Sequence, residues 1–132
     1  MTLSARIGLL ITAIGADIKA LGASLLLKQD LNLAIQPNTA SYTLVLANNG
    51  KTVTQNVATA NNVTVPRNSS VAFPIGCTIP IVQLGVGQVT IVAGTGTTLN
   101  ASNGLKLRAR YSMAFLHKVA SDTWIVGGDV AV

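Results

Sequence analysis

The sequence has few of the residues from which catalytic and metal sites are built. Among 132 residues there is one histidine, one cysteine and no glutamate, and all four acidic residues are aspartates. A Ser-His-Asp triad would have to use His117, and a carboxylate pair would have to use Asp122 and Asp129, which are typical turn residues beside Trp124. No phosphate-binding loop or metal-ligand spacing is present in the sequence. We therefore expect a protein that is not an enzyme, with no catalytic residues, no metal and no cofactor.

Cysteine and aromatic residues are equally scarce. A single cysteine excludes a disulfide within the chain, and Cys77 lies in the apolar run "FPIGCTIPIV", so we expect a small buried side chain. Aromatic residues make up only 4%. We expect Phe73, Phe115 and Trp124 in the core, which leaves few aromatic surfaces for stacking on sugars or bases.

Charged residues are fewer than the solvent-exposed surface of a monomer usually has. Hydrophobic residues make up 49% and charged residues 10%, which excludes disorder and suggests that other copies or a larger assembly cover part of the surface. The net charge of +5 favours anionic partners. Without clustered basicity and interleaved aromatics, we expect no nucleic-acid binding.

The opening stretch "ARIGLLITAIGADIKALGASLLL" has apolar residues that alternate at spacings of four and three. This is the heptad pattern of a coiled coil, and isoleucine at both core positions favours three or four strands over two. We call these residues the helix seam: Ile7, Ile11, Ile14, Ile18, Leu21 and Leu25. The sequence predicts a helix that associates with copies of itself. The alternative is a single amphipathic helix that packs against the β domain of the same chain.

Three glycines, Gly8, Gly15 and Gly22, recur at one flank of this heptad. Each costs a helix about 1 kcal/mol relative to alanine, so they indicate close approach of packed backbones rather than a free helix. A membrane span is disfavoured because Asp17 and Lys19 lie mid-stretch. A secretion signal fits badly because large residues precede the plausible cleavage sites.

The rest of the chain favours β structure. Short Thr- and Val-rich runs alternate with Gly, Pro and Asn turns every few residues, which is typical of an antiparallel sandwich or barrel. The runs "TIPIVQLG" and "QVTIVAG" on either side of "VG" indicate a hairpin. We expect an N-terminal helix over residues 1–28, a linker over 29–40 and a compact β domain over 41–132.

One segment, "KLRAR", places Lys106, Arg108 and Arg110 at alternate positions. Along a single strand this period would put all three on one face. The pattern predicts either a solvated strand face or a contact with an anionic surface.

Several stretches carry a family resemblance: "YTLVLANNGKTVTQN", the run from "NVTVPRNSS" through "FPIGCTIPIVQLGVGQVTIVAGTGTTLNASNG", and "DTWIVGGDV". Together, from Tyr42 to Asp129, they resemble a small β domain of tail-fibre-like and minor structural proteins of tailed bacteriophages. The opening "ARIGLLITAIGADIKAL" is similar to a segment that precedes such domains.

This resemblance implies a virion protein that forms a parallel homotrimer and contacts other capsid or tail proteins. The chain is short, without a shaft or collagen-like repeat, which suits a capsid decoration or short appendage. The alternative is a receptor-binding tail fibre or tip protein, whose partner would be a polymer of the host cell surface. The head or tail location and the docking end stay open.

Overall fold

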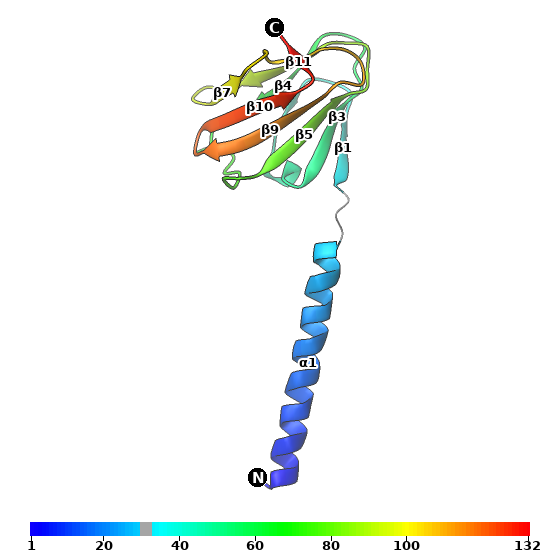
Figure 1. Cartoon of the computed structure of the whole chain (residues 1–132), viewed down its shortest axis with the longest axis vertical. Coiled ribbons are helices and arrows are strands. Elements are labelled where there is room, and N and C mark those ends of the chain that lie inside the picture. The colour runs from blue at the N-terminus through cyan, green and yellow to red at the C-terminus, as the bar shows by residue number, and fades with distance from the viewer. Residues whose placement is uncertain (30–32) are drawn as a thin grey trace. The chain divides into compact units, whose positions relative to one another are not determined.

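The structure, a computed structural model, describes the backbone of residues 1–29 and 33–132 and the side chains of residues 1–22 and 33–132. The chain divides into two units, Met1–Asn32 and Leu33–Val132. The first contains one helix and the second contains all the strands (Figure 1). The predicted combination of an N-terminal helix and a mainly β domain is confirmed.

Helix α1 spans Leu3–Gln29. It begins after Thr2, whose side-chain oxygen accepts a hydrogen bond from the Ala5 backbone N–H at 3.2 Å, as an N-cap residue does. Leu, Ile and Ala, which are good or tolerated helix formers, make up most of the helix around its three glycines. The described part has exposed apolar side chains along its length, including Leu9 and Leu10 outside the helix seam.

The β unit contains two sheets. Sheet A has the strand order β1 (Ala34–Asn38), β3 (Lys51–Gln55), β5 (Thr78–Gln83), β9 (Met113–Ala120), β10 (Thr123–Gly128) and β7 (Thr98–Ala101). Sheet B has the order β11 (Val130–Ala131), β8 (Lys106–Leu107), β6 (Val89–Ala93), β4 (Asn61–Val65) and β2 (Tyr42–Thr43). A short 3-10 helix, Leu46–Asn48, lies between β2 and β3.

The chain alternates between the two sheets as it advances, so that β1, β3 and β5 lie side by side in parallel, as do β2, β4 and β6. This is the winding of a β-solenoid, in which each coil adds one strand to each sheet. The predicted antiparallel sandwich or barrel is therefore wrong for the first three coils. Repeated Thr/Val runs do not distinguish the two arrangements, because both bury alternate residues of short strands.

Antiparallel pairing appears only towards the C-terminus. Strands β9 and β10 form a hairpin, and β9 also pairs antiparallel with β5 (Figure 1, orange to red). In sheet B, β8 is antiparallel to both β6 and β11. The C-terminal strands thus continue both sheets beyond the last solenoid coil, where β9 and β8 run antiparallel to the adjacent strands of that coil.

The core lies between the sheets and consists of aligned aliphatic side chains. Val53 of β3 is in register with Ile81 of β5, and Val63 of β4 is in register with Ile91 of β6; all four are buried. Trp124 and Phe73 close one part of the core as an edge-to-face pair with centroids 5.5 Å apart. Burial of Trp124, Phe73 and Cys77 confirms the sequence prediction for those three residues.

The corner between the sheets explains why the predicted hairpin is wrong. Strands β5 and β6 belong to different sheets, and the loop between them stacks on the loop between β3 and β4. The backbone N–H of Gly85 donates to the Gln55 carbonyl at 3.0 Å, and that of Gly87 donates to the Val57 carbonyl at 2.9 Å. A Cβ at Gly85 or Gly87 would overlap the backbone of this underlying loop.

The β unit begins earlier than expected. Strand β1 occupies Ala34–Asn38, inside the segment 29–40 that was predicted to be a linker, and pairs along its whole length with β3. The polar residues and Pro37 are untypical of a central strand, so the sequence did not indicate a strand here. However, β1 is the edge strand of sheet A, where proline is tolerated.

Replacing Gly87 by alanine should destabilise the β unit by about 1–3 kcal/mol or more, because the new methyl group overlaps the Thr59 backbone and the coils must separate. Unfolding in denaturant is followed by fluorescence of Trp124, the only tryptophan. Gly127→Ala is the matched control, since nothing lies within 4 Å of its added Cβ. Equal stability of the two variants would contradict tight coil stacking.

Candidate functional site

The described side chains of the helix seam are exposed on helix α1. Ile7, Ile11, Ile14, Ile18 and Leu21 are 48–65% exposed, while Leu25 falls outside the residues whose side chains the structure describes. Isoleucine and leucine are rarely exposed in such a regular series, and a row of them marks a surface that another element covers. The seam is therefore a candidate binding surface, formed by a single helix.

Space is also open beside the seam. A Cβ added at Gly8, Gly15 or Gly22 would meet nothing within 4 Å. The three positions thus leave a strip of bare backbone along the helix flank, against which a second helix backbone can pack closely. Among the described residues, no helix is long and apolar enough to cross a lipid bilayer.

The basic segment is shorter as a strand than predicted. Strand β8 ends at Leu107, and the chain then turns, with Tyr111 in the left-handed region at φ 71°. Lys106, Arg108 and Arg110 are all exposed, but only Lys106 lies on the strand. The period-two argument therefore does not apply to the three residues as a set.

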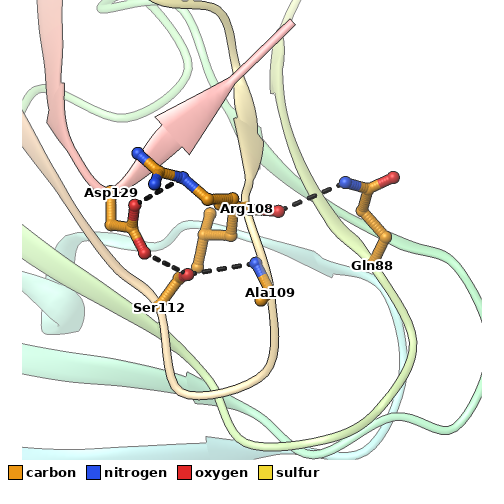
Figure 2. Close-up of polar contacts among 6 residues, drawn as sticks. Gln88, Arg108, Ala109, Ser112 and Asp129 are labelled. Atoms are coloured by element: carbon orange, nitrogen blue, oxygen red, sulfur yellow. Dashed lines mark hydrogen bonds and ion pairs between the residues drawn. The ribbon is translucent and has the colours of Figure 1, made fainter.

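Figure 2 shows how Arg108 is held. Its Nε lies 2.9 Å from Asp129 Oδ1, and the other carboxylate oxygen accepts a hydrogen bond from Ser112 Oγ at 2.6 Å. Ser112 Oγ in turn accepts the Ala109 backbone N–H at 3.0 Å. On strand β8, just before Arg108, the Leu107 carbonyl accepts a hydrogen bond from the Gln88 side chain at 3.2 Å. Arg108 therefore helps to hold the turn between β8 and β9 against Asp129, which directly follows β10.

Arg110 is also engaged locally. Its Nε donates to the Leu84 carbonyl at 2.8 Å, and its guanidinium lies 4.7 Å from the centre of the Tyr111 ring. These contacts orient the side chain without neutralising its charge. Arg108–Asp129 is the only ion pair among the described residues, so the segment keeps Lys106 and Arg110 as uncompensated exposed cations.

The sequence analysis missed an apolar surface on sheet A. The outward side chains of β9 are Met113, Phe115, His117 and Val119, and three of these four are apolar and about 40% exposed. Phe115 pairs in register with Pro80 of β5 and is 42% exposed, so its predicted place in the core is wrong. The signal was present, because "MAFLHKV" is apolar at both odd and even positions, which indicates burial on both faces.

We call this surface the sheet-A face, defined by its exposed or half-buried residues: Val82, Met113, Phe115, Val119 and Ile125. His117 lies on it, with Nδ1 2.8 Å from Thr78 Oγ1, and its strand neighbour in β10 is Ile125. No group of three or more His, Cys, Asp or Glu among the described residues is placed to hold a metal ion.

A hollow of about 510 Å³ lies beside β2, at the edge of sheet B. Leu44, Val45, Pro66 and Val71 provide apolar walls, and Arg67 is the one charged residue in its lining. The same lining includes hydroxyl groups from Thr43, Thr64, Ser70 and Thr95.

No family model, curated protein or solved structure matches the chain.

Ser112→Ala should destabilise the β unit by about 1–3 kcal/mol, because the buried Ser112 hydroxyl makes two hydrogen bonds, one of them to a carboxylate, and both are lost. Arg108→Ala should cost below about 1 kcal/mol, since its side chain is 65% exposed and its ion pair is screened by solvent. Denaturant unfolding followed by Trp124 fluorescence measures both. The reverse order would show that the ion pair, and not the serine, holds the turn.

Proposed function

We propose that this protein is a non-enzymatic structural component of a bacteriophage virion, a homotrimeric surface appendage that docks on the particle. The observation that carries the proposal is the exposed helix seam, five described Ile and Leu residues in unbroken heptad spacing. A surface of this kind requires a partner, and a heptad seam is itself the surface that best complements another heptad seam.

The energetics favour association over a free helix. Burying the seam side chains gains on the order of 10 kcal/mol per chain before entropy is counted. Three helix glycines cost about 1 kcal/mol each, and ordering the chains costs several more. Isoleucine at both core positions selects higher oligomers over a dimer, and the parallel homotrimer follows from the phage resemblance.

The β unit supports the same proposal. The sheet-A face is apolar and contains no carboxylate or ammonium group among its defining residues. Copies held together by their helices bring their β units to high local concentration, where a weak apolar contact becomes effective. A surface with few charges is expected when neighbouring copies or the particle cover it.

The virion assignment rests on the resemblance to tail-fibre-like and minor structural phage proteins. Capsid decoration and a short head or tail fibre both fit a brief helix followed by one β unit. The proposed partners are therefore copies of the chain itself and other capsid or tail proteins, with the virion as the location.

A second function, receptor binding by a tail fibre or tip, is favoured by one observation. Lys106 and Arg110 remain as exposed, uncompensated cations close to each other in the sequence, and such groups attract anionic cell-wall polymers. Binding of the purified protein to host cells, lost on Lys106→Ala with Arg110→Ala, would support this function over decoration.

Replacing Ile14 and Ile18 by asparagine should convert a trimer of about 41 kDa into a 13.6 kDa monomer, because two layers of the seam become polar. Light scattering coupled to gel filtration, without detergent, measures the mass. The matched control is Leu9→Asn with Ala16→Asn, which adds the same polar groups at the outermost heptad position. A double seam variant that stays trimeric would refute the seam assignment.

A chain that starts at Leu33 should be folded and monomeric, because it keeps every strand but lacks the helix. Starting at Ser41 would remove β1 and expose the next strand of sheet A. The mass and the buried-tryptophan fluorescence of the Leu33 chain are the two readouts. A trimer without the helix would instead assign assembly to the sheet-A face.

The virion proposal is tested on particles purified from the strain that encodes the chain. Mass spectrometry of the particles should detect the protein at a copy number divisible by three, and antibody labelling should locate it on the head or the tail. Absence from purified particles would overturn the proposed function while leaving the trimer prediction intact.

A further inference from the structure

The β unit contains one buried lysine without an acidic partner. Lys118 on β9 is 1% exposed, and among the described residues its Nζ has no carboxylate within ion-pair distance. The amine instead donates to two oxygens, the Asn68 side-chain Oδ1 at 2.6 Å and the Phe73 carbonyl at 2.7 Å. Lysine is almost never fully buried without a charged partner, so this arrangement requires an explanation.

Asn68 presents its carboxamide to this amine from the segment between β4 and β5. Its backbone N–H donates to the Asp122 carboxylate, with Oδ1 2.6 Å away, and Asp122 lies in the turn between β9 and β10. The same turn is held to β7, because the Asp122 carbonyl accepts a hydrogen bond from the Thr98 backbone N–H at 2.8 Å. The Asn68 side-chain amide therefore contacts the Lys118 amine, while its backbone is held by the Asp122 carboxylate.

The surroundings exclude water from the amine. The Trp124 ring centre lies 5.8 Å from Lys118 Nζ, and Phe73 packs edge-to-face on that ring. Backbone hydrogen bonds fix the lysine on both sides, since its N–H donates to the Cys77 carbonyl and its own carbonyl accepts the Gly76 N–H. The amine is thus held in a buried site against the side-chain amide of Asn68, which is the proximity that an intramolecular reaction between the two groups requires.

We propose that Lys118 and Asn68 form an intramolecular isopeptide bond after the chain folds. The amine nitrogen attacks the Asn68 Cγ, one N–C bond forms, and the Cγ–Nδ2 bond breaks. The proton released by the amine leaves with the amide nitrogen as ammonia. No oxidant, metal or second substrate is needed, since an amine and a primary amide yield a secondary amide and ammonia.

Asp122 acts as a positioning residue, because its carboxylate holds the Asn68 backbone. The nearby Cys77 does not compete as a nucleophile. Burial raises the pKa of the Cys77 thiol, with Lys118 acting in the opposite direction, and the thiol therefore remains protonated at neutral pH.

The bond would join residues 50 positions apart and close a loop that contains β5 to β8. A covalent closure of this kind restricts the unfolded chain in the same way as a disulfide, and it does not depend on an oxidising compartment. In a protein with a single cysteine, the bond permanently links the connection between β4 and β5 to strand β9.

Intact-mass spectrometry of the full chain, purified in its folded form, tests the bond. The wild-type mass should fall short of the sequence mass by one ammonia. Trypsin should leave the peptide 111–132 uncut after Lys118 and joined to the peptide 68–106, because an acylated lysine is not cleaved. Full mass and two separate peptides would overturn the proposal.

Two variants identify the source of the mass loss. Lys118→Arg and Asn68→Ala should each restore the full expected mass, whereas the control Lys106→Arg, at an exposed lysine, should keep the deficit. Ring closure of Asn68 on its own backbone also releases ammonia, but that loss would persist in Lys118→Arg and would overturn the proposal. The branched peptide from the wild-type chain decides the matter even if a variant fails to fold.

Discussion

The rest of the β unit depends on the contact between successive coils at their corners. There the Gly85 and Gly87 amides donate to carbonyls of the preceding coil, and the absence of a Cβ lets the two backbones touch. This spacing brings β3 beside β5 and β4 beside β6, so that aliphatic residues align in register and close the core. A side chain at either glycine would separate the coils and with them the backbone hydrogen bonds of both sheets.

Burial is distributed unequally between the two units. The β unit has a core of its own, whereas the described helix residues form no core among themselves. A single 27-residue helix of this composition cannot bury its own apolar residues, so its stability depends on a surface that packs against it. That is why the proposed function is assembly rather than chemistry, and why the few polar contacts of the basic segment are better explained as turn supports. The buried Lys118 is the exception, since its neighbours are reactive groups and not a counter-ion.

Much of the fold could be predicted because it follows from local patterns. The heptad spacing located the helix to within two residues of its ends, and Thr/Val runs identified most of the strands. Two of the failed assignments, the linker over residues 29–40 and the core position of Phe115, have local physical reasons. Pro37 and its polar neighbours concealed β1, since an edge strand tolerates what a central strand does not. Alternation in "MAFLHKV" was read as one buried face, although its outer positions are also apolar and place Phe115 on the surface.

The sequence by itself determined the helix, its seam, the β content and the shortage of catalytic groups, because composition and short-range periodicity carry that information. Only the tertiary structure decided that the strands wind as parallel coils, that Arg108 is paired with Asp129, and that Lys118 meets Asn68. These are contacts between residues about 20 to 50 positions apart, and their partners are chosen by how the coils stack. No local pattern specifies that choice, since it results from burying all the strands at once.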